Sequence, residues 1–502
     1  MKINRRSFLA GTAGLALTGA AFRLKRLEAA EPQLLRIPEL VDARAQANGI
    51  VLTAQHGRTA FFAQREAATR GFNGSYLGPT IRLYRGDDVE VSVTNAMRDA
   101  TAVHWHGLII PAEFDGGPHQ LIQPGATWRP RLKIDQPAAT LWYHAHPHGV
   151  TARQVYAGLA GMIIVADEAE RGLGLPSNYG VDDLPVILQD KVFDEGRLVY
   201  PDHPMVAMQG LRGNTVLVNG TRNAVARVPA SLVRLRLLNG SNARVYDLSI
   251  ADGRAFQWIA TDGGLLERPV ERRSLWLAPG QRAEILVDLS DGRAVALRTD
   301  RDPAFGTFMM GTMGGMGEPL DRPTTVLRLE PQGGAAAAKP AVPERLVEGE
   351  RLDPTRADRR RQLRLTMGMG GMMGRRGMMG GMGPGMGRGM MGGMGAFGID
   401  GRAFDIERTD QTVRLGHTEI WEISGDMMVH PFHMHGVHFE VLSRGGSRPA
   451  MGDRGARDTV LVQEPVEILV RFTQPAASVP FMFHCHTLEH EDAGMMGQYK
   501  TA

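Results

Sequence analysis

The sequence predicts an all-β protein built from three related β-sandwich domains. Short segments of alternating apolar and polar residues recur along the 502-residue chain, with Gly, Pro and Asn turns between them, as in β-sandwiches. No long segment shows the periodicity of an amphipathic helix. Two parts of the chain repeat each other, which indicates internal duplication. At about 150 residues per domain, the length fits three domains.

The alternation is clearest in five segments that we expect to be strands: 89–95, 140–146, 232–239, 284–289 and 467–473. Residues 136–146 (QPAATLWYHAH) and 474–486 (QPAASVPFMFHCH) both begin with QPAA and end in H-x-H. In the middle third, residues 248–250 (LSI) stand where the outer thirds place histidines. We therefore expect ligands in the outer domains and none in the middle one.

The first 30 residues are interpreted as an export signal. Arg5 and Arg6 lie in the segment NRRSFL, ahead of a short and weakly apolar stretch, which resembles a twin-arginine (Tat) signal. We therefore expect a periplasmic protein exported by the Tat machinery. The expected divisions are the signal at 1–30, domains at 31–165, 166–330 and 361–502, a linker at 331–360 and an insertion at 366–395.

The composition excludes several classes of partner. The net charge of +3 includes six basic side chains and one acid within the first 30 residues, so the rest of the chain is not basic and a nucleic-acid partner is not expected. No apolar run reaches about 18 residues, so we expect no stable membrane association. The single Cys permits no internal disulfide. We expect a monomer.

Pairs of histidines with one residue between them are the strongest functional signal. Sixteen histidines in 502 residues would give about 0.5 such pairs by chance, and the chain has five: His104/His106, His144/His146, His146/His148, His433/His435 and His484/His486. On a strand, residues i and i+2 lie about 6.6 Å apart on one face. The two imidazoles of a pair can therefore bind different ions of one metal cluster.

Cys485 lies between the two histidines of the last pair. Alternation along a strand sends its thiol to the face opposite both neighbours. With His430, His490 and Met495, it forms the donor set of two His, one Cys and a weak axial Met that is typical of a blue-copper electron-transfer site. A thiolate bound to copper explains how a lone thiol persists in an oxidising compartment.

Four segments resemble the copper motifs of multicopper oxidases: HWHG (104–107), WYHAHPHG (142–149), HPFHMHG (430–436) and HCHTLEHEDAGMM (484–496). The resemblance covers most of the chain after the signal and is greatest to bacterial periplasmic cuprous oxidases of copper tolerance, which are laccase-like. It implies three cupredoxin-like Greek-key β-sandwich domains. It also implies four copper ions, one of type 1, one of type 2 and two of type 3.

The resemblance implies a role for each ligand. Type 2 copper would bind His104 and His433. One type 3 ion would bind His106, His144 and His486, and the other would bind His146, His435 and His484. Type 1 copper would bind His430, Cys485, His490 and Met495. The three-ion cluster would then lie between the first and third domains. Asp115 and Glu491 are expected to supply protons, and Asp426 to hydrogen-bond a type 1 ligand.

Fifteen of the 27 methionines lie in two Gly-rich segments, 308–316 and 366–395. Thioethers are soft ligands suited to Cu(I), so the segments are a candidate site for a Cu(I) substrate: Met309, Met310, Met313, Met316, Met367, Met369, Met372 and Met373. The alternative is a flexible insertion of low complexity. Such segments in the family often contain His or Asp, but 366–395 has neither and carries three Arg, which repel a cation.

Together these patterns indicate an enzyme that oxidises a one-electron donor, with Cu(I) as the expected substrate, and reduces O2 to water. A laccase-like oxidase of small phenols would use the same copper centres. A copper-sequestering protein with little turnover is the alternative outside the enzymes, although all ten His ligands and Cys485 are present.

Overall fold

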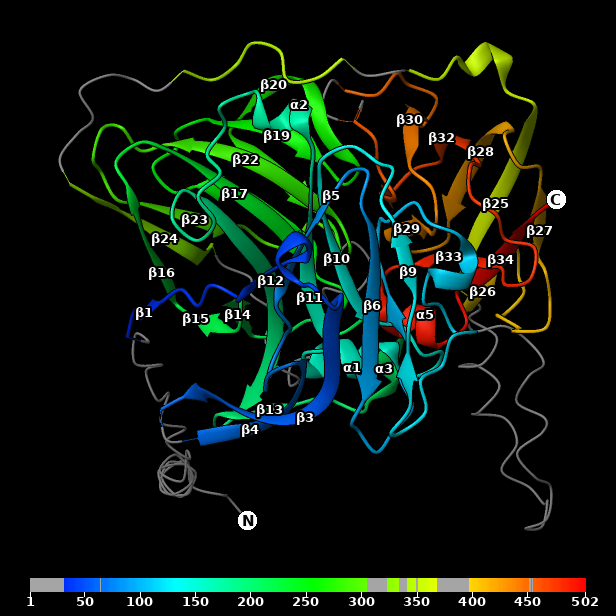
Figure 1. The fold of residues 1–502 in the computed structure, drawn as a ribbon, viewed down its shortest axis with the longest axis horizontal. Helices are drawn as coiled ribbons and strands as arrows, with labels where there is room; N and C mark the ends of the chain where they lie inside the picture. Colours follow the sequence, from blue (N-terminus) through cyan, green and yellow to red (C-terminus); the bar gives the residue numbers. More distant parts are fainter. Residues whose placement is uncertain are drawn as a thin grey trace, which may run out of the picture.

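Three β-sandwiches account for most of the computed structural model, which describes residues 31–63, 65–304, 323–333, 341–348, 351–367, 397–450, 453 and 455–502. In Figure 1 the N-terminal third lies at the centre, the middle third on the left and the C-terminal third on the right. The predicted all-β fold is confirmed. The five strands expected from alternation are present as β6, β10, β17, β22 and β32, with ends within two residues of those expected.

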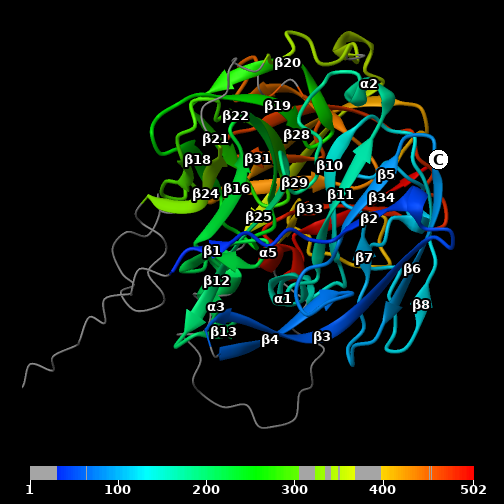
Figure 2. The ribbon, with the colours of Figure 1, turned by 60° about the vertical axis from the view of Figure 1, so that its left-hand side comes forward.

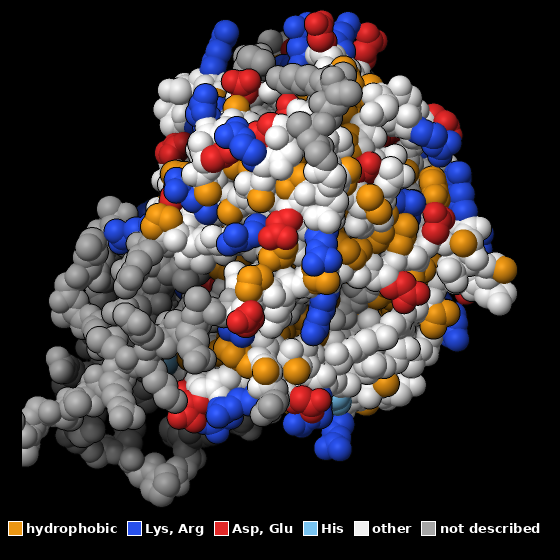
Figure 3. Space-filling view, turned by 90° about the vertical axis from the view of Figure 1, so that its left-hand side faces the viewer, with side chains coloured by type: hydrophobic (Ala, Val, Ile, Leu, Met, Phe, Trp, Pro, Cys, Tyr) orange, Lys and Arg blue, Asp and Glu red, His pale blue; other side chains and the backbone are white. Residues whose placement is uncertain are grey.

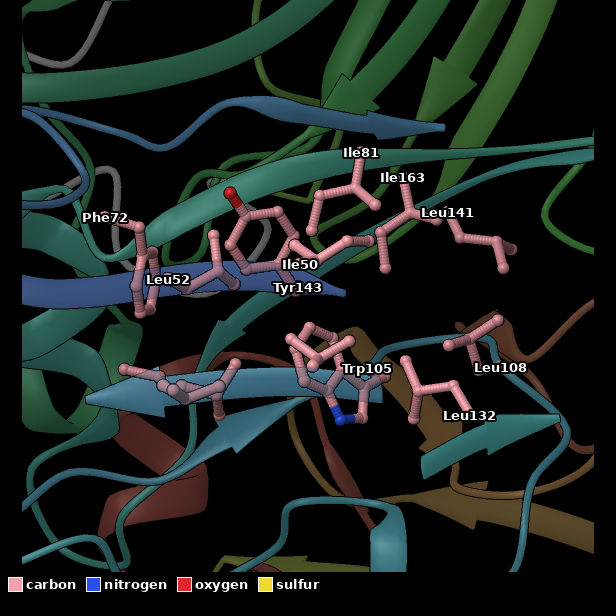
Figure 4. Packing of buried hydrophobic residues seen from close by; sticks show 14 of the residues in the cluster. Ile50, Leu52, Phe72, Ile81, Trp105, Leu108, Leu132, Leu141, Tyr143 and Ile163 are labelled. Carbon is pink, nitrogen blue, oxygen red and sulfur yellow. The ribbon is translucent and has the colours of Figure 1, made fainter. Parts of the chain in front are cut away.

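The N-terminal sandwich packs two five-stranded sheets face to face. One has the order β2 (Leu40–Asp42), β5 (Thr80–Tyr84), β11 (Ala160–Ala166), β10 (Ala139–Ala145), β7 (Val103–His104). The other has β4 (Arg65–Phe72), β3 (Ile50–Phe62), β6 (Asp88–Asn95) and β8 (Thr127–Trp128), with β9 (Arg131–Lys133) beside β6. Alternate side chains of both sheets meet between them (Figure 4), where Trp105 and Tyr143 are fully buried.

The middle sandwich has a six-stranded and an eight-stranded sheet. The first has the order β1 (Gln33–Leu34), β16 (Ala224–Pro229), β24 (Thr324–Gln332), β23 (Val295–Thr299), β18 (Tyr246–Ile250), β21 (Ser274–Leu277). The second has β15 (Thr221–Arg222), β14 (Thr215–Val218), β12 (Asp183–Asp194), β17 (Leu232–Asn239), β22 (Arg282–Asp288), β19 (Phe256–Thr261) and β20 (Gly264–Arg272), with β13 (Arg197–Val199) beside β12. The chain therefore enters the middle sandwich through β1 before it builds the N-terminal one.

The C-terminal sandwich has two five-stranded sheets. One has the order β26 (Phe397–Ile399), β25 (Arg359–Met367), β28 (Thr418–Gly425), β32 (Val466–Arg471), β30 (Phe439–Arg444). The other has β27 (Gln411–Val413), β34 (Met496–Thr501), β33 (Phe481–Cys485), β29 (His430–Met434), β31 (Thr459–Val462). Its core is aromatic, with Trp421 packed edge-on against Phe483.

Short helices connect the sandwiches: α1 (Thr151–Ala157), α2 (Glu168–Arg171), α3 (Pro204–Gln209), α5 (Leu488–Asp492) and the 3-10 turns Ala43–Ala45, Ala112–Phe114 and Pro354–Arg356. Helix α5 packs against both α1 and α3 (Figure 1). The carboxylate of Asp492 accepts hydrogen bonds from the backbone N–H groups of Thr151 and Ala152, both at 2.9 Å. Glu489 accepts one from the Tyr200 hydroxyl at 3.0 Å. One C-terminal helix thus fastens all three thirds together.

The face of the molecule in Figure 3 carries charged side chains of both signs, and the basic and acidic groups are interspersed. Within the described part of the chain, no helix has both the length and the apolar character needed to cross a membrane.

Lys191 on β12 is a buried base whose ionisation we expect to affect stability. Its Nζ donates a hydrogen bond to the carbonyl oxygen of Tyr156 at 2.7 Å, and burial lowers its pKa from 10.5 to about 7. The unfolded chain binds more protons than the folded one between these pH values, so the free energy of unfolding should rise with pH from 7 towards 10, by at most roughly 1.4 kcal/mol per pH unit.

Lys191→Met should flatten this rise. Denaturant unfolding at pH 7, 8 and 9 measures it, with the exposed Lys133→Met as the matched control that keeps the wild-type slope. An unchanged slope in Lys191→Met would show that the amine stays charged in the folded protein.

Candidate metal centre

Eight imidazoles from the outer thirds of the chain converge between the N-terminal and C-terminal sandwiches. They are His104, His106, His144, His146, His433, His435, His484 and His486, each at most 1% exposed. The sheet register brings the first members together, because His144 pairs with His104 across β10 and β7. His484 pairs with His433 across β33 and β29 in the same way.

Each pair lies at the end of its strand, which differs from the expectation that both imidazoles sit on one strand. His104 is the last residue of β7, and His106 lies two residues beyond it. The second members of the other three pairs follow directly after β10, β29 and β33. The second imidazole of each pair is therefore placed by the segment beyond the strand and not by the strand itself.

The ring nitrogens are close enough to share metal ions. Nε2 of His104 lies 3.4 Å from Nε2 of His433. Nε2 of His484 lies 3.3 Å from Nε2 of His146 and 3.2 Å from Nε2 of His435. Nitrogens bound about 2 Å from one ion lie at most about 4 Å apart. All three spacings therefore allow metal ligation.

The cluster also passes a chemical test for a bound metal. Five ring nitrogens of four histidines are buried without a hydrogen-bond partner: His106 Nδ1, His144 Nε2, His146 Nδ1 and both nitrogens of His486. Burial, followed by neighbouring imidazoles, lowers the pKa of these rings well below 6.5, so each ring is neutral, with one N–H group and one lone pair. An orphaned buried polar atom costs roughly 1–3 kcal/mol. An imidazole binds copper through one nitrogen, so ligation would satisfy at most one orphaned nitrogen of each of these rings.

The two expected proton donors lie against the cluster. Asp115 Oδ2 accepts a hydrogen bond from Nδ1 of His435 at 2.7 Å. Glu491 Oε2 lies 3.2 Å from Nδ1 of His484. Burial raises the pKa of Glu491 well above its usual range, which favours the protonated carboxyl.

Asp458 is a cluster residue that the sequence patterns did not indicate. Its Oδ1 accepts a hydrogen bond from Nε2 of His106 at 2.9 Å, and its carbonyl oxygen accepts one from Nδ1 of His433 at 2.9 Å. Burial alone would raise its pKa, but Arg282 and His106 hold the pKa well below the usual range. In the sequence, Asp458 stands directly before the strand Thr459–Val462. An acidic residue at that position is also common in turns, so it gave no functional signal.

A second constellation lies on the other face of β29 and β33. The Sγ atom of Cys485 is 3.5 Å from Nδ1 of His430 and 3.6 Å from Nδ1 of His490. Met495 is fully buried in the same core, and its carbonyl oxygen accepts a hydrogen bond from the N–H of Cys485 at 3.0 Å. Burial raises the pKa of the Cys485 thiol to about 12 and lowers that of His430 to about 4. This donor set also fits copper.

Backbone carbonyls orient both histidines of this site. Nε2 of His430 donates to the carbonyl oxygen of Asp426 at 3.1 Å, and Nε2 of His490 donates to that of Met208 on α3 at 3.1 Å. Asp426 thus contacts the ligand His430 through its backbone carbonyl and not through its side chain. The side-chain oxygen Oδ1 instead accepts a hydrogen bond from Nε of Arg364 at 2.7 Å.

Only part of the candidate Cu(I) site lies within the described residues. Met367 ends β25 and pairs with Phe397 of β26, and the ring of Phe397 stacks on His490 with centroids 4.9 Å apart. The remaining candidate Cu(I) ligands lie outside the described residues: Met309, Met310, Met313, Met316, Met369, Met372 and Met373. Of the unassigned histidines, His148 packs edge-on against Phe404 and lines a cavity of about 570 Å³.

Comparisons with known proteins identify relatives of the whole chain. Models of the family described as multicopper oxidase match residues 53–170 and 384–502. The protein named cell division protein FtsP of Xenorhabdus nematophila is 39% identical over 502 residues, covering 99% of this chain and 98% of the relative. FtsP of Escherichia coli is 38% identical over 503 residues with the same coverage. These curated relatives carry a cell-division name and not that of a cuprous oxidase.

Solved structures give the same fold. A laccase-like multi-copper oxidase, CueO of Ochrobactrum sp., has a TM-score of 0.81 and 39% identity, covering 93% of this chain and 100% of that one. It is described as active towards lignin model compounds and lignosulfonate. The McoA multicopper oxidase of Aquifex aeolicus has a TM-score of 0.79 and 30% identity, covering 94% of this chain and 99% of that one.

Metal binding at Cys485 should release the thiol proton. Because the pKa of the thiol is raised to about 12, an ion must displace the proton, and the apparent affinity should rise about tenfold per pH unit at neutral to mildly alkaline pH. Titration of metal-free protein with Co(II) measures this through the thiolate-to-metal absorption. Cys485→Ser should lose that absorption, and a pH-independent affinity would contradict the expectation.

Proposed function

Since the chain belongs to the multicopper oxidase family, we propose that it oxidises a one-electron donor, Cu(I), and reduces O2 to water. The observation that carries this proposal is the complete pair of donor sets: ten imidazoles and one thiol in two sites joined by His484, Cys485 and His486. We propose four copper ions, one at the Cys485 site and three in the eight-histidine cluster. Bound copper would supply one-electron redox chemistry that couples four donor oxidations to the reduction of O2 to two water molecules.

The backbone at Cys485 joins the two sites by a short covalent path. The thiol of Cys485 faces one site, while the flanking His484 and His486 face the other. The shortest covalent connection between the two sites is therefore one residue long. Burial of every ligand excludes bulk water, so that O2 reduction is kept apart from donor oxidation.

Reduction of O2 to water consumes four protons, which the buried cluster must receive from the protein. Glu491, whose pKa is raised by burial, lies beside His484, and Asp115 lies beside His435. We propose that both carboxyl groups pass protons to the cluster.

Cu(I) is favoured as donor by where the Met-rich insertion joins the sandwich. The insertion leaves β25 after Met367 and returns at Phe397, whose ring covers His490. Its start and end therefore lie beside the thiolate site, where soft thioethers can deliver Cu(I). The arginines Arg375, Arg376 and Arg388 would weaken cation binding, so the thioethers must supply the selectivity.

The N-terminal sequence supports a proposal for the cellular setting. We propose export through the Tat machinery to the periplasm, where oxidation of Cu(I) contributes to copper tolerance. The resemblance of the segment NRRSFL, with Arg5 and Arg6, to a twin-arginine signal supports this proposal.

A laccase-like activity on phenols is the alternative within the family, supported by the activity ascribed to the Ochrobactrum relative. Replacing residues 369–395 with a Gly-Ser linker leaves the β25–β26 pairing intact and distinguishes the two. Under the Cu(I) proposal, O2 uptake with Cu(I) should fall about tenfold, equivalent to about 1.4 kcal/mol, while phenol oxidation should rise or stay constant. A full-length variant with every Met of the segment changed to Ser separates thioether chemistry from loop length. Undiminished Cu(I) oxidation in both variants would contradict the role of the insertion.

A role in cell division is the second candidate function, favoured by the FtsP relatives that match 99% of the chain. Deleting the gene in its source cell and scoring both septation and copper tolerance tests it. If the protein acts only as an oxidase, wild type but not Cys485→Ser should restore copper tolerance, and septation should be normal throughout. Filamentation that Cys485→Ser repairs would establish a division role independent of the thiolate site.

A further inference from the structure

The described part of the middle sandwich supplies no imidazole or thiol to the two donor sets, but one of its turns reaches the eight-histidine cluster. The turn before β22 places Gly280 with φ of +80° so close to His486 that an added Cβ would lie 2.9 Å from the imidazole carbon Cδ2. Two residues later, Arg282 is fully buried against Asp458. Both contacts come from one short segment, β22 packs beside β10 of the N-terminal sandwich, and Figure 2 shows the green middle sandwich lying against the other two.

Arg282 joins all three sandwiches at this point. Its Nη1 donates to Asp458 Oδ1 at 2.8 Å, and its Nη2 donates to Oδ2 of the same carboxylate. Its Nε donates to the carbonyl oxygen of Thr140 in the N-terminal sandwich at 3.1 Å. Asp262 of the middle sandwich accepts from the N–H of Arg282 at 2.8 Å and from that of Thr459 at 3.3 Å. The bidentate pair therefore has a fixed orientation.

Asp458 determines which nitrogens of two cluster imidazoles are free, through its carboxylate at His106 and through its backbone carbonyl at His433. Asp458 Oδ1 accepts from Nε2 of His106, which leaves the lone pair on Nδ1. The carbonyl oxygen of Asp458 accepts from Nδ1 of His433, which leaves the lone pair on Nε2 facing His104. Each contact selects a tautomer and restricts rotation of its ring.

The backbone around His106 is fitted to the same pair. Gly107 has φ of +92°, and an added Cβ would lie 2.7 Å from both Arg282 Nη2 and Asp458 Oδ2. The carbonyl oxygen of Gly107 accepts a hydrogen bond from Nε2 of His438 at 3.0 Å. The HWHG motif thus needs its glycine because the ion pair occupies the space of a side chain.

We propose that Asp458, held by Arg282 of the middle sandwich, is a positioning residue that sets the ring orientation of His106 and His433 and thereby the copper affinity and geometry of the cluster. The middle sandwich is then a structural part of the oxygen-reducing site although it donates no ligand. The inference rests on the proposed function only in taking the eight-histidine cluster as a copper site.

Asp458→Asn tests this because it keeps the size of the side chain and removes the charge that Arg282 holds. The variant should keep the thiolate absorption of the Cys485 site, bind cluster copper roughly 10- to 100-fold more weakly, and show an altered electron paramagnetic resonance signal of the cluster copper. Arg282→Lys, which keeps one positive charge but cannot bind both oxygens, should change the same signal by a smaller amount. Copper content after dialysis against a graded chelator measures the affinity.

The matched control is Asp190→Asn, which breaks an equally buried pair with Arg244 at 2.8 Å, away from the cluster. It should lower the thermal midpoint and leave the copper signals unchanged. Wild-type affinity and signal in folded Asp458→Asn, or in Arg282→Lys where Asp458→Asn does not fold, would overturn the inference, as would equal losses in Asp190→Asn. Wild-type protein that retains no cluster copper would instead overturn the proposed function.

Discussion

The structure depends on burying ten imidazoles and one thiol where water cannot solvate them. A buried polar atom without a partner is destabilising, and five ring nitrogens of the cluster have none within the described residues. Burial keeps the rings neutral, which removes the larger penalty of buried charge but leaves the lone pairs unsatisfied. The cluster is therefore a destabilising element until an ion binds, and metal binding and folding stability are coupled.

The rest of the molecule counteracts this cost by cross-linking the sandwiches around the cluster. Helix α5 is tied to α1 through Asp492 and to the middle sandwich through Glu489. Arg282 and Asp458 link the middle and C-terminal sandwiches beside His106. A buried ion pair is weak evidence for stability by itself. Here, however, the Arg282–Asp458 pair and the hydrogen bonds of helix α5 fix the relative placement of the sandwiches whose strand ends supply the ligands. Correct domain packing and correct ligand geometry are thus one requirement.

Much of the site could be predicted because its signals are local. Alternation placed the thiol of Cys485 opposite its neighbours, and the repeated H-x-H pattern indicated the four ligand segments. The contacts of Asp458 could not be predicted, because its partners are His106, 352 positions away, and Arg282, 176 positions away. The interaction of Asp426 was similarly hidden, since only the parallel pairing of β25 with β28 places Arg364 beside its carboxylate. The strand-end position of the histidine pairs depends on where hydrogen bonding between strands stops, which periodicity alone does not determine.

The completeness of the ligand sets bears on the choice between an oxidase and a binding role. A protein that used this scaffold only for its surface would keep the sheets and gain nothing from orphaned imidazoles, which apolar residues of similar size could replace at lower cost. The middle sandwich shows that a β-sandwich of this chain forms around a core of aliphatic and aromatic side chains, Leu248 and Ile250 among them, without buried imidazoles in that core. Retaining ten imidazoles and a thiol in two adjacent buried sites is therefore best explained by copper chemistry, whatever donor reaches Cys485. A division role, if present, would have to use surfaces other than these, because every one of the ligands is buried.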